Sequence, residues 1–322
     1  MPGRKLPLIL FASVFAMMIG GDANAAPGDE PTLFSPGPIE ADAPTDVAPA
    51  FSPDGKTVFF GRRQAGGTVS LFMAKRSGQG WSTPAAASFS GSYNDLEPAF
   101  DPHGHYLIFA SSRPIMAGGE ALVGRWSNID HPHGGGNLWR IDPRRRDAIP
   151  MRLPEQINAN GSTFSPAVAG DGSLWFMRAD DGNHFHIFRS ALRGGQYQSP
   201  QPAPFTDPLY GDFDPAVAPD ESFIIFSSSS KRSGTPGDPV TDLYISFRTK
   251  QGWTRPLDLR TAISPRVRGV EARLSPDLRM LYFSNAIGPS GQTTPSASYI
   301  WQVPLDLPRL RAMSRQVPPA AS

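Results

Sequence analysis

Cysteine is absent from this 322-residue chain, which excludes disulfides, thiolate metal sites, thiol nucleophiles and a lipid attached through cysteine. Charged residues are scarce, at 18%, and 30 Lys and Arg nearly balance 29 Asp and Glu. This balance provides no electrostatic footprint for nucleic acid or anionic lipid. Proline and glycine are plentiful instead, with 35 and 32 residues, and both disfavour helix interiors. Because 39% of the residues are hydrophobic and 10% are aromatic, we expect a folded, turn-rich protein.

The amino-terminal residues have the pattern of a secretory signal peptide. Arg4 and Lys5 precede an apolar run over residues 6–18, and a small-x-small cleavage site occupies residues 23–25. The apolar run is shorter than the roughly 20 residues that a membrane span requires. We therefore predict that residues 1–25 are removed, that no transmembrane segment remains, and that the mature chain is periplasmic or secreted.

One phrase recurs five times along the chain. It contains a Pro-Ala pair or its equivalent, then a turn of the Pro-Asp-Gly type, then a run rich in Phe, Ile, Val and Tyr. The five copies cover residues 46–60, 95–109, 163–176, 212–226 and 269–283. Their turns lie 49, 68, 49 and 57 residues apart, which are spacings typical of propeller blades. Each copy predicts a β-hairpin, because turn-forming residues separate two β-prone runs.

Two more strands are predicted in each repeat. Third strands are expected at residues 70–73, 137–140, 186–189, 242–245 and 299–302. Fourth strands that pair an aromatic residue with a nearby proline are expected at residues 81–84, 197–200 and 253–256. Proline there suits an outer edge strand. Four strands per repeat predict an all-β fold, a β-propeller of four-stranded antiparallel blades. We favour five blades over six, because no gap is long enough to hide a blade without the motif.

The two ends of the chain are expected to close the ring. Residues 34–39 resemble a fourth strand without a blade, whereas the last repeat has only its first three strands. Pairing of the N-terminal and C-terminal strands would complete that blade. The predicted organisation is therefore a signal peptide over 1–25, a short linker over 26–33, a propeller over 34–305 and a C-terminal tail over 306–322.

The repeated phrases resemble a known family. Residues 49–56 (PAFSPDGK), 97–102 (EPAFDP) and 242–244 (DLY) are similar to the WD40-like (PD40) β-propeller repeat typical of the TolB C-terminal domain. The resemblance covers residues 46–301 and implies the fold. It does not specify an activity, since such repeats occur in translocation scaffolds, in peptidase-associated propellers and in some sugar-acid lyases. Only about 20 residues separate the predicted cleavage site from the first hairpin, so we expect the TolB N-terminal domain to be absent.

Six acidic residues occupy two positions of the repeat and are the first candidate ligand-binding residues. The first position holds Asp46, Asp95 and Asp212, and the position two residues later holds Glu97, Asp214 and Glu271. A spacing of two places both sets on one face of a strand, so up to six carboxylates would converge on one mouth of the channel. They would hold a cation, or hydrogen-bond a sugar or a basic peptide. The alternative is that each aspartate bonds backbone amides between blades.

Further candidates begin the third strands and fill one insertion. His186, Asp242 and Asn137 share the first position of a third strand, where a side chain could contact a ligand. The Gly-rich insertion over residues 114–136 causes the longest repeat spacing and contains four loop candidates, Arg125, Trp126, His131 and His133. Long loops in compact domains are usually functional or disordered, so the insertion is either a ligand lid or partner-binding loop, or a mobile excursion.

The leading interpretation is a non-enzymatic, TolB-like exported propeller that binds a ligand or an envelope protein at one face. Signatures of a serine nucleophile, a phosphate-binding loop, a zinc protease and a dinucleotide site are missing from the sequence, and no catalytic residue is assigned. The alternative is a metal-dependent hydrolase or lyase that acts on carbohydrate at the channel mouth. We expect no cofactor, with a divalent cation at the carboxylates as the open alternative. The partner or saccharide, and the oligomeric state, are not specified by the sequence.

Overall fold

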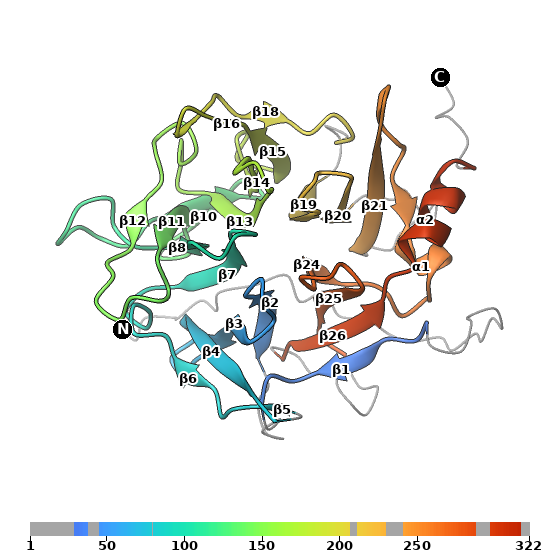
Figure 1. Ribbon diagram of the computed structural model, residues 1–322. Coiled ribbons are helices and arrows are strands. Elements are labelled where there is room, and N and C mark those ends of the chain that lie inside the picture. Colours follow the sequence, from blue (N-terminus) through green and yellow to red (C-terminus); the bar gives the residue numbers. More distant parts are fainter. Residues whose placement is uncertain are drawn as a thin grey trace, which may run out of the picture.

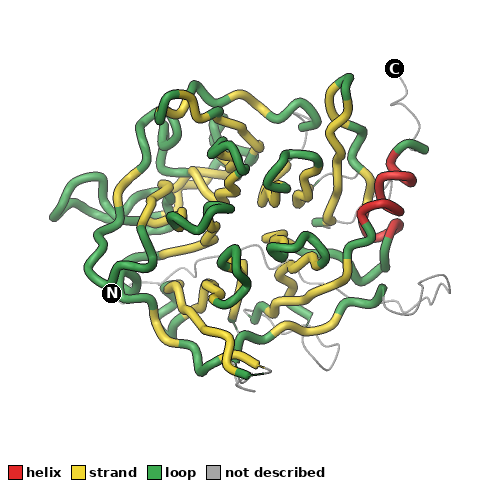
Figure 2. Tube along the Cα trace, in the orientation of Figure 1, coloured by secondary structure: helices red, strands yellow, loops and turns green. Residues whose placement is uncertain are grey.

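Five antiparallel sheets form a ring around a common axis (Figures 1 and 2). This computed structural model describes residues 29–37, 45–78, 80–206, 211–229, 241–287 and 297–316. The predicted all-β fold with five blades is confirmed. The predicted signal peptide lies outside the described residues. Within the described ranges, no helix is both long and apolar enough to cross a membrane.

The first two blades follow the predicted order from inner to outer strand. Blade 1 consists of β2 (Asp46–Phe51), β3 (Thr57–Arg63), β4 (Val69–Ser77) and two short outer strands, β5 (Gly80–Trp81) and β6 (Ala85–Ala86). Blade 2 consists of β7 (Asp95–Phe100), β8 (Leu107–Ser111), β11 (Asn137–Ile141) and β12 (Met151–Arg152). The insertion, residues 114–136, separates β8 from β11 and contains the hairpin of β9 (Gly124–Trp126) and β10 (Ile129–His131).

Blades 3 and 4 repeat this arrangement with small additions. Blade 3 consists of β13 (Thr163–Val168), β14 (Leu174–Arg178), β15 (His186–Ser190) and β18 (Gln201–Pro202), with a side hairpin of β16 (Leu192–Arg193) and β17 (Gln196–Tyr197). Blade 4 consists of β19 (Asp212–Val217), β20 (Phe223–Ser228), β21 (Asp242–Thr249), β22 (Gly252–Trp253) and β23 (Leu257–Asp258). The outer strands are only two residues long, which limits exposed edges.

Blade 5 joins the two ends of the chain, as predicted. Its first three strands are β24 (Val270–Leu274), β25 (Met280–Asn285) and β26 (Tyr299–Pro304). Its outer strand is β1 (Thr32–Phe34), which pairs antiparallel with β26 so that Phe34 lies opposite Ile300. The strand begins two residues before the predicted start of the propeller, and residues 38–44 lie outside the described part of the chain. Pairing of β1 with β26 closes the ring.

Replacing Phe34 with alanine is expected to lower the free energy of unfolding by roughly 2 kcal/mol. Phe34 packs edge-on against Tyr282 and Phe51, with ring centroids 5.0 Å and 5.6 Å away, so its loss weakens the closure of the ring. Denaturant unfolding of the variant measures the effect. Thr32→Ala, at an exposed site of the same strand, is the control and should change stability little. Equal effects of the two substitutions would contradict the role of Phe34.

The core consists of five apolar clusters, one between each pair of neighbouring blades. Neighbouring blades cover both faces of each sheet. A strand such as β20, the second strand of blade 4, therefore has a continuous apolar run rather than an alternating pattern. Ile224 and Phe226 of that strand pack toward blade 3, whereas Phe223 and Ile225 pack toward blade 5. The apolar runs of the sequence therefore hold each blade to both of its neighbours.

The Pro-Asp-Gly phrase forms the turn between the first two strands of a blade. In blade 1, the Ser52 hydroxyl donates to Asp54 Oδ1 at 2.6 Å, and that oxygen also accepts from the Lys56 backbone N–H. Gly55 has a φ of +67°, a conformation that glycine adopts without steric cost. Ser275 and Asp277 repeat the bond in blade 5. The turn chemistry explains why this phrase recurs at the same place in the repeat.

Two helices pack beside blades 4 and 5 (Figures 1 and 2). The helix α1 (Leu259–Ala262) is one turn long and is capped by Asp258. The helix α2 (Leu307–Ser314) lies in the segment predicted to be a tail, is capped by Asp306 and contacts β21. Its Leu310 is buried in the cluster between blades 4 and 5. The tail thus contributes to the core, a role that repeat periodicity could not reveal because no other blade has this helix.

Candidate functional site

A backbone feature is shared by the inner strands of all five blades. The third residue of each inner phrase has a positive φ, between 46° and 57°, at Ala48, Glu97, Ser165, Asp214 and Glu271. In each blade the register between the first and second strands shifts at this point. A residue other than glycine rarely adopts this conformation, and a bulge re-aims the side chain it carries. Since the inner strands contact one another in a closed ring, these side chains lie around the axis.

Three of the five side chains are carboxylates, which we call the ring carboxylates: Glu97, Asp214 and Glu271. Burial, followed by the charges of the other two, raises the pKa of Glu97 well above its ordinary value. Burial and then the charge of Asp214 raise the pKa of Glu271 to about 7. Burial also raises the pKa of Asp214, although Arg273 opposes that shift. Glu271, with a pKa of about 7, is therefore partly protonated near neutral pH, where exposed carboxyls are ionised, and the pKa values of Glu97 and Asp214 are shifted in the same direction.

Hydrogen bonds from the ring carboxylates link different blades. Glu97 Oε2 accepts from the Ser165 backbone N–H at 2.6 Å, and Asp214 Oδ2 accepts from the Glu271 backbone N–H at 2.8 Å. Arg273 donates to the Ser165 hydroxyl at 3.3 Å. Within the described residues, Asp214 Oδ1 and Glu271 Oε2 have no hydrogen-bond partner. The described residues contain no group of three His, Asp or Glu close enough to hold a metal ion.

The other set of predicted carboxylates lies apart from the ring. Asp46 forms a bidentate pair with Arg62, at 2.7 Å and 2.8 Å, within blade 1. Asp95 is buried and bonds Ser90 at 2.6 Å and Arg113 at 3.1 Å. Asp212 is fully buried at the start of β19.

The prediction that six carboxylates converge is therefore wrong, and three of them do so. The bulge breaks the alternation on which that prediction depended. A bulge adds one extra residue to the inner strand, so residues that are two apart across it no longer point to the same face of the sheet. Asp95 consequently contacts groups of its own blade, whereas Glu97 reaches Ser165 of blade 3. Asp46 and Asp95 pair with arginines, and Asp95 also accepts from the Gly91 backbone in the loop between blades 1 and 2, as the alternative interpretation expects.

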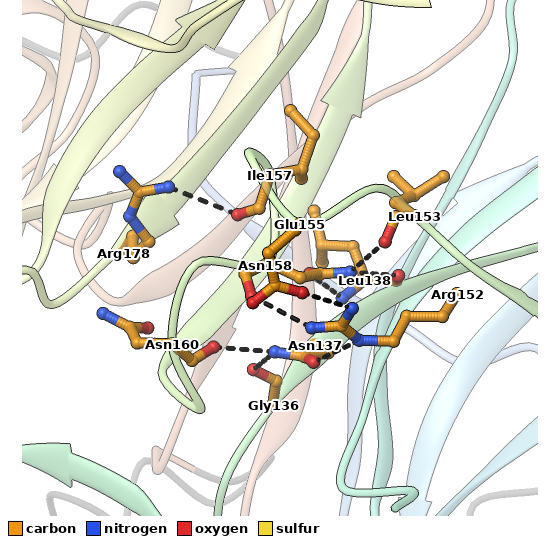
Figure 3. Close-up of polar contacts among 10 residues, drawn as sticks. All are labelled: Gly136, Asn137, Leu138, Arg152, Leu153, Glu155, Ile157, Asn158, Asn160 and Arg178. Atoms are coloured by element: carbon orange, nitrogen blue, oxygen red, sulfur yellow. Dashed lines mark hydrogen bonds and ion pairs between the residues drawn. The ribbon is translucent and has the colours of Figure 1, made fainter. Parts of the chain in front are cut away.

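The candidates at the start of the third strands have separate surroundings. Asp242 is buried between Arg260, at 3.1 Å, and Arg268, at 3.7 Å. His186 is partly exposed and lies 3.7 Å from Asp181. Asn137 is buried in the polar network that Figure 3 shows, where its amide group donates to the Asn160 carbonyl at 2.7 Å. The structure does not bring these three residues together.

The network around Asn137 connects blade 2 to the loop that leads to blade 3 (Figure 3). Arg152 donates to Asn137 Oδ1 at 2.7 Å and to Glu155 at 2.8 Å. Asn158 bonds both the N–H and the carbonyl of Leu138. These bonds satisfy the polar groups of Asn137 internally, so this residue fixes the loop.

The insertion contains a folded hairpin that contacts blade 3. His131 stacks on Trp126, with ring centroids 3.7 Å apart and an interplanar angle of 7°. Arg125 forms an ion pair with Asp130 at 2.8 Å. The backbone N–H of Ser127 donates to the Asn183 carbonyl of blade 3 at 2.8 Å. The carbonyl of His133 accepts from Asn94 at 3.1 Å, so the turn of the hairpin and the last part of the insertion are both bonded to the body of the propeller.

Apolar side chains are exposed along the insertion, a feature that the sequence analysis missed. Within the described part of the chain, the exposed large hydrophobic residues are Ile115, Met116, Val123, Ile129, Ile149 and Met151. Four of these six belong to the insertion, and their exposed fractions range from 53% to 77%. The sequence did contain a signal for this surface, because apolar residues lie among the glycines of the insertion. Exposed apolar side chains that gather on one segment are a feature of interaction surfaces.

The insertion and the ring carboxylates are at the same end of the propeller. Ser111, at the end of β8, lies opposite both Asp95 at the start of β7 and Asn137 at the start of β11. The insertion joins β8 to β11 and so leaves the blade where the inner strand begins. Glu97 is the third residue of that inner strand. One face of the molecule therefore presents the insertion outside and the ring carboxylates near the axis.

Comparison with known proteins identifies the fold. No family model and no curated protein matches the chain. TolB from Acinetobacter baumannii matches with a TM-score of 0.50 and 16% identity over 82% of this chain, which spans about half, 55%, of the length of that TolB. A thermostable family-43 glycoside hydrolase matches with a TM-score of 0.52 and 10% identity, over 82% of this chain and 92% of that one. These likenesses show a β-propeller with TolB among its structural neighbours.

Proposed function

We propose that the chain is an exported TolB-like β-propeller that acts as a protein-interaction module, with the insertion as its docking surface. This proposal depends on one observation, that four exposed apolar side chains lie on an insertion whose hairpin is ordered by internal and cross-blade bonds. A rigid loop loses little conformational entropy when it binds, so its apolar surface contributes fully to affinity. The predicted signal peptide would place the partner outside the cytoplasm.

The chemistry of this face describes the partner that would fit. Met116 and Ile129 would pack against an apolar surface of the partner. The propeller supplies the rigid support for this contact, as propellers do for many unrelated functions.

A double substitution on the insertion is expected to abolish capture of the partner. Met116→Ser with Ile129→Ser removes apolar surface at sites that are 77% and 58% exposed, so folding should be unaffected. The measurement is quantitative affinity capture from a cell-envelope extract, comparing each protein recovered by the variant with that recovered by the wild type. We expect at least about a tenfold loss of the specific partner.

The matched control is Ile149→Ser with Met151→Ser, which removes comparably exposed apolar side chains from the outer edge of the same blade. This control should capture the partner as well as the wild type does. Equal recovery by the insertion variant and the wild type, or equal losses in both double variants, would contradict the proposed docking surface.

A further inference from the structure

A second candidate site lies at the seam where the ends of the chain close the ring. A cleft of about 600 Å³, which we call the seam cleft, is lined by residues of blade 5 and blade 1. Figure 1 shows the two outer strands, β1 and β5, near each other at the edge of the molecule. The aromatic and polar side chains of its lining are Phe34, Ser35, Arg76, Trp81, Tyr282 and Gln302.

Three aromatic side chains form the apolar part of the seam cleft. Phe34 of β1 meets Tyr282 of β25 and Trp81 of β5 edge-on, with ring centroids 5.0 Å and 6.3 Å apart. Phe51 packs against two of them, with its ring centroid 4.7 Å from that of Tyr282 and 6.0 Å from that of Trp81. Because each ring is held by at least two others, the walls are preorganised.

Polar groups line the same cleft and are available to a ligand. Tyr282 is only 7% exposed, yet its hydroxyl makes no hydrogen bond to the described residues. Burial raises the pKa of this phenol to about 12, so the hydroxyl keeps its proton and can donate. The guanidinium of Arg76 lies 4.7 Å from the centroid of the Trp81 ring and leaves N–H groups at the rim. Gln302 and Ser35 also line the cleft, but the Gln302 amide donates to Thr32 Oγ1 at 3.4 Å and the Ser35 hydroxyl donates to the Gly37 carbonyl.

The repeat provides an internal comparison for this site. Trp253 of blade 4 occupies the repeat position of Trp81, at the start of the outer strand. It packs against Trp175 and Phe205, with ring centroids 5.7 Å and 5.6 Å apart. At the seam, Trp81 instead faces Phe34 of β1, the N-terminal strand that completes blade 5. The opening thus follows from the ring closure rather than from the repeat.

The lining selects one class of ligand. A purely hydrocarbon ligand would leave the Tyr282 and Arg76 donors unpaired, and unpaired polar groups cost free energy. A small ion would gain nothing from three aromatic walls. A sugar ring meets both requirements, because C–H groups cover its faces and hydroxyl oxygens surround its edge. Pockets of this size hold small molecules of one or two rings.

We propose that the seam cleft binds a neutral pyranose saccharide of one or two sugar units. The ring packs against Trp81 and Phe34, and the Tyr282 hydroxyl and Arg76 donate hydrogen bonds to its hydroxyl oxygens. This site is separate from the insertion, and it functions whether or not the insertion binds a protein.

Titration of the full-length mature protein with saccharides tests the proposal. The probes are glucose, galactose, mannose, N-acetylglucosamine, cellobiose and maltose, monitored by isothermal titration calorimetry and by tryptophan fluorescence. We expect saturable binding of at least one probe and a loss of affinity of about tenfold or more in Trp81→Ala, which removes an aromatic wall. The matched control, Trp253→Ala, should leave the affinity unchanged.

A second variant keeps the test decisive if Trp81→Ala does not fold. Arg76 is exposed, so Arg76→Ala should fold normally and still weaken saccharide binding several-fold. Absence of saturable binding of all six probes to the wild type would overturn the proposal. Binding that is unchanged in both Trp81→Ala and Arg76→Ala would also overturn it, as would binding of benzoate or inorganic phosphate in preference to every sugar.

Discussion

Replacing Glu221 with alanine is expected to lower the free energy of unfolding by roughly 3 kcal/mol. Glu221 lies in the turn between β19 and β20 and is only 5% exposed. Its carboxylate accepts from Arg189 and Arg248 at 2.6 Å each and from the Trp175 indole N–H at 2.8 Å. The alanine variant leaves two cations and a buried indole N–H without their acceptor, and such losses are expensive.

The blade-to-blade position of Glu221 makes the effect large. Trp175 and Arg189 belong to blade 3, whereas Glu221 and Arg248 belong to blade 4, so one carboxylate joins two sheets. Alanine tolerates the positive φ of 53° at this site about as well as glutamate does, so backbone strain is not altered. Denaturant unfolding measures the change.

The control for this prediction is another acidic residue paired with an arginine. Glu155 bonds Arg152 at 2.8 Å, but its side chain is 72% exposed. Glu155→Gln should therefore change stability by less than about 1 kcal/mol, as is usual for exposed ion pairs. A loss in Glu221→Ala as small as the loss in the control would show that burial of the carboxylate does not matter.

Much of the fold could be predicted because the same turn and strand signals recur in five copies of the repeat. The turns of the Pro-Asp-Gly type, the β-prone runs after them and the missing fourth strand of blade 5 were visible in the sequence. Each has a local physical cause, such as the Ser52 and Asp54 hydrogen bonds of the first turn. The closure by β1 followed from counting strands rather than from its three residues. Repeated local signals reinforce one another, which single elements such as α2 cannot do.

The candidate site was harder to predict because it depends on departures from the repeat. The bulge at Glu97 and its equivalents separates residues that simple alternation places together, and nothing in the Asp-x-Glu letters indicates a positive φ. The arginine partner Arg62 belongs to β3 and Arg113 follows the end of β8, so the pairing emerges only in the folded blade. The seam cleft likewise joins Phe34 to Tyr282, which are far apart in the sequence.

The bulge also connects the fold to its electrostatics. By turning the third residue of each inner phrase toward the axis, it gathers three carboxylates, one serine and one alanine in one ring. A fully charged ring would repel itself in a buried setting, so the carboxyls respond by taking up protons. Arg273 opposes the rise in the pKa of Glu97 and Asp214, but burial outweighs it. Stability should therefore depend on pH near neutrality, where ordinary carboxyls do not titrate.

Unfolding of the wild type is expected to become easier as the pH rises from 5 to 8, through the titration of Glu271. Its pKa in the folded protein is about 7, against an ordinary value of 4.5 for a glutamate side chain. A carboxyl with a raised folded pKa binds its proton more tightly when folded, so stability increases as the pH falls from about 7 toward 4.5. Above that window the ionised group is destabilising. The shift sets an upper limit of about 3 kcal/mol on this contribution.

Glu271→Gln isolates the contribution of this residue, because the amide cannot ionise. The variant should be more stable than the wild type at pH 8, by up to about 3 kcal/mol, and the difference should shrink toward pH 5. Unfolding free energies at both pH values measure the change. The control is Asp142→Asn, whose exposed carboxyl has its pKa lowered to about 2 by Arg144 and so stays ionised throughout this range. A difference between Glu271→Gln and the wild type that is the same at pH 5 and pH 8 would show that Glu271 does not titrate in the window its burial requires.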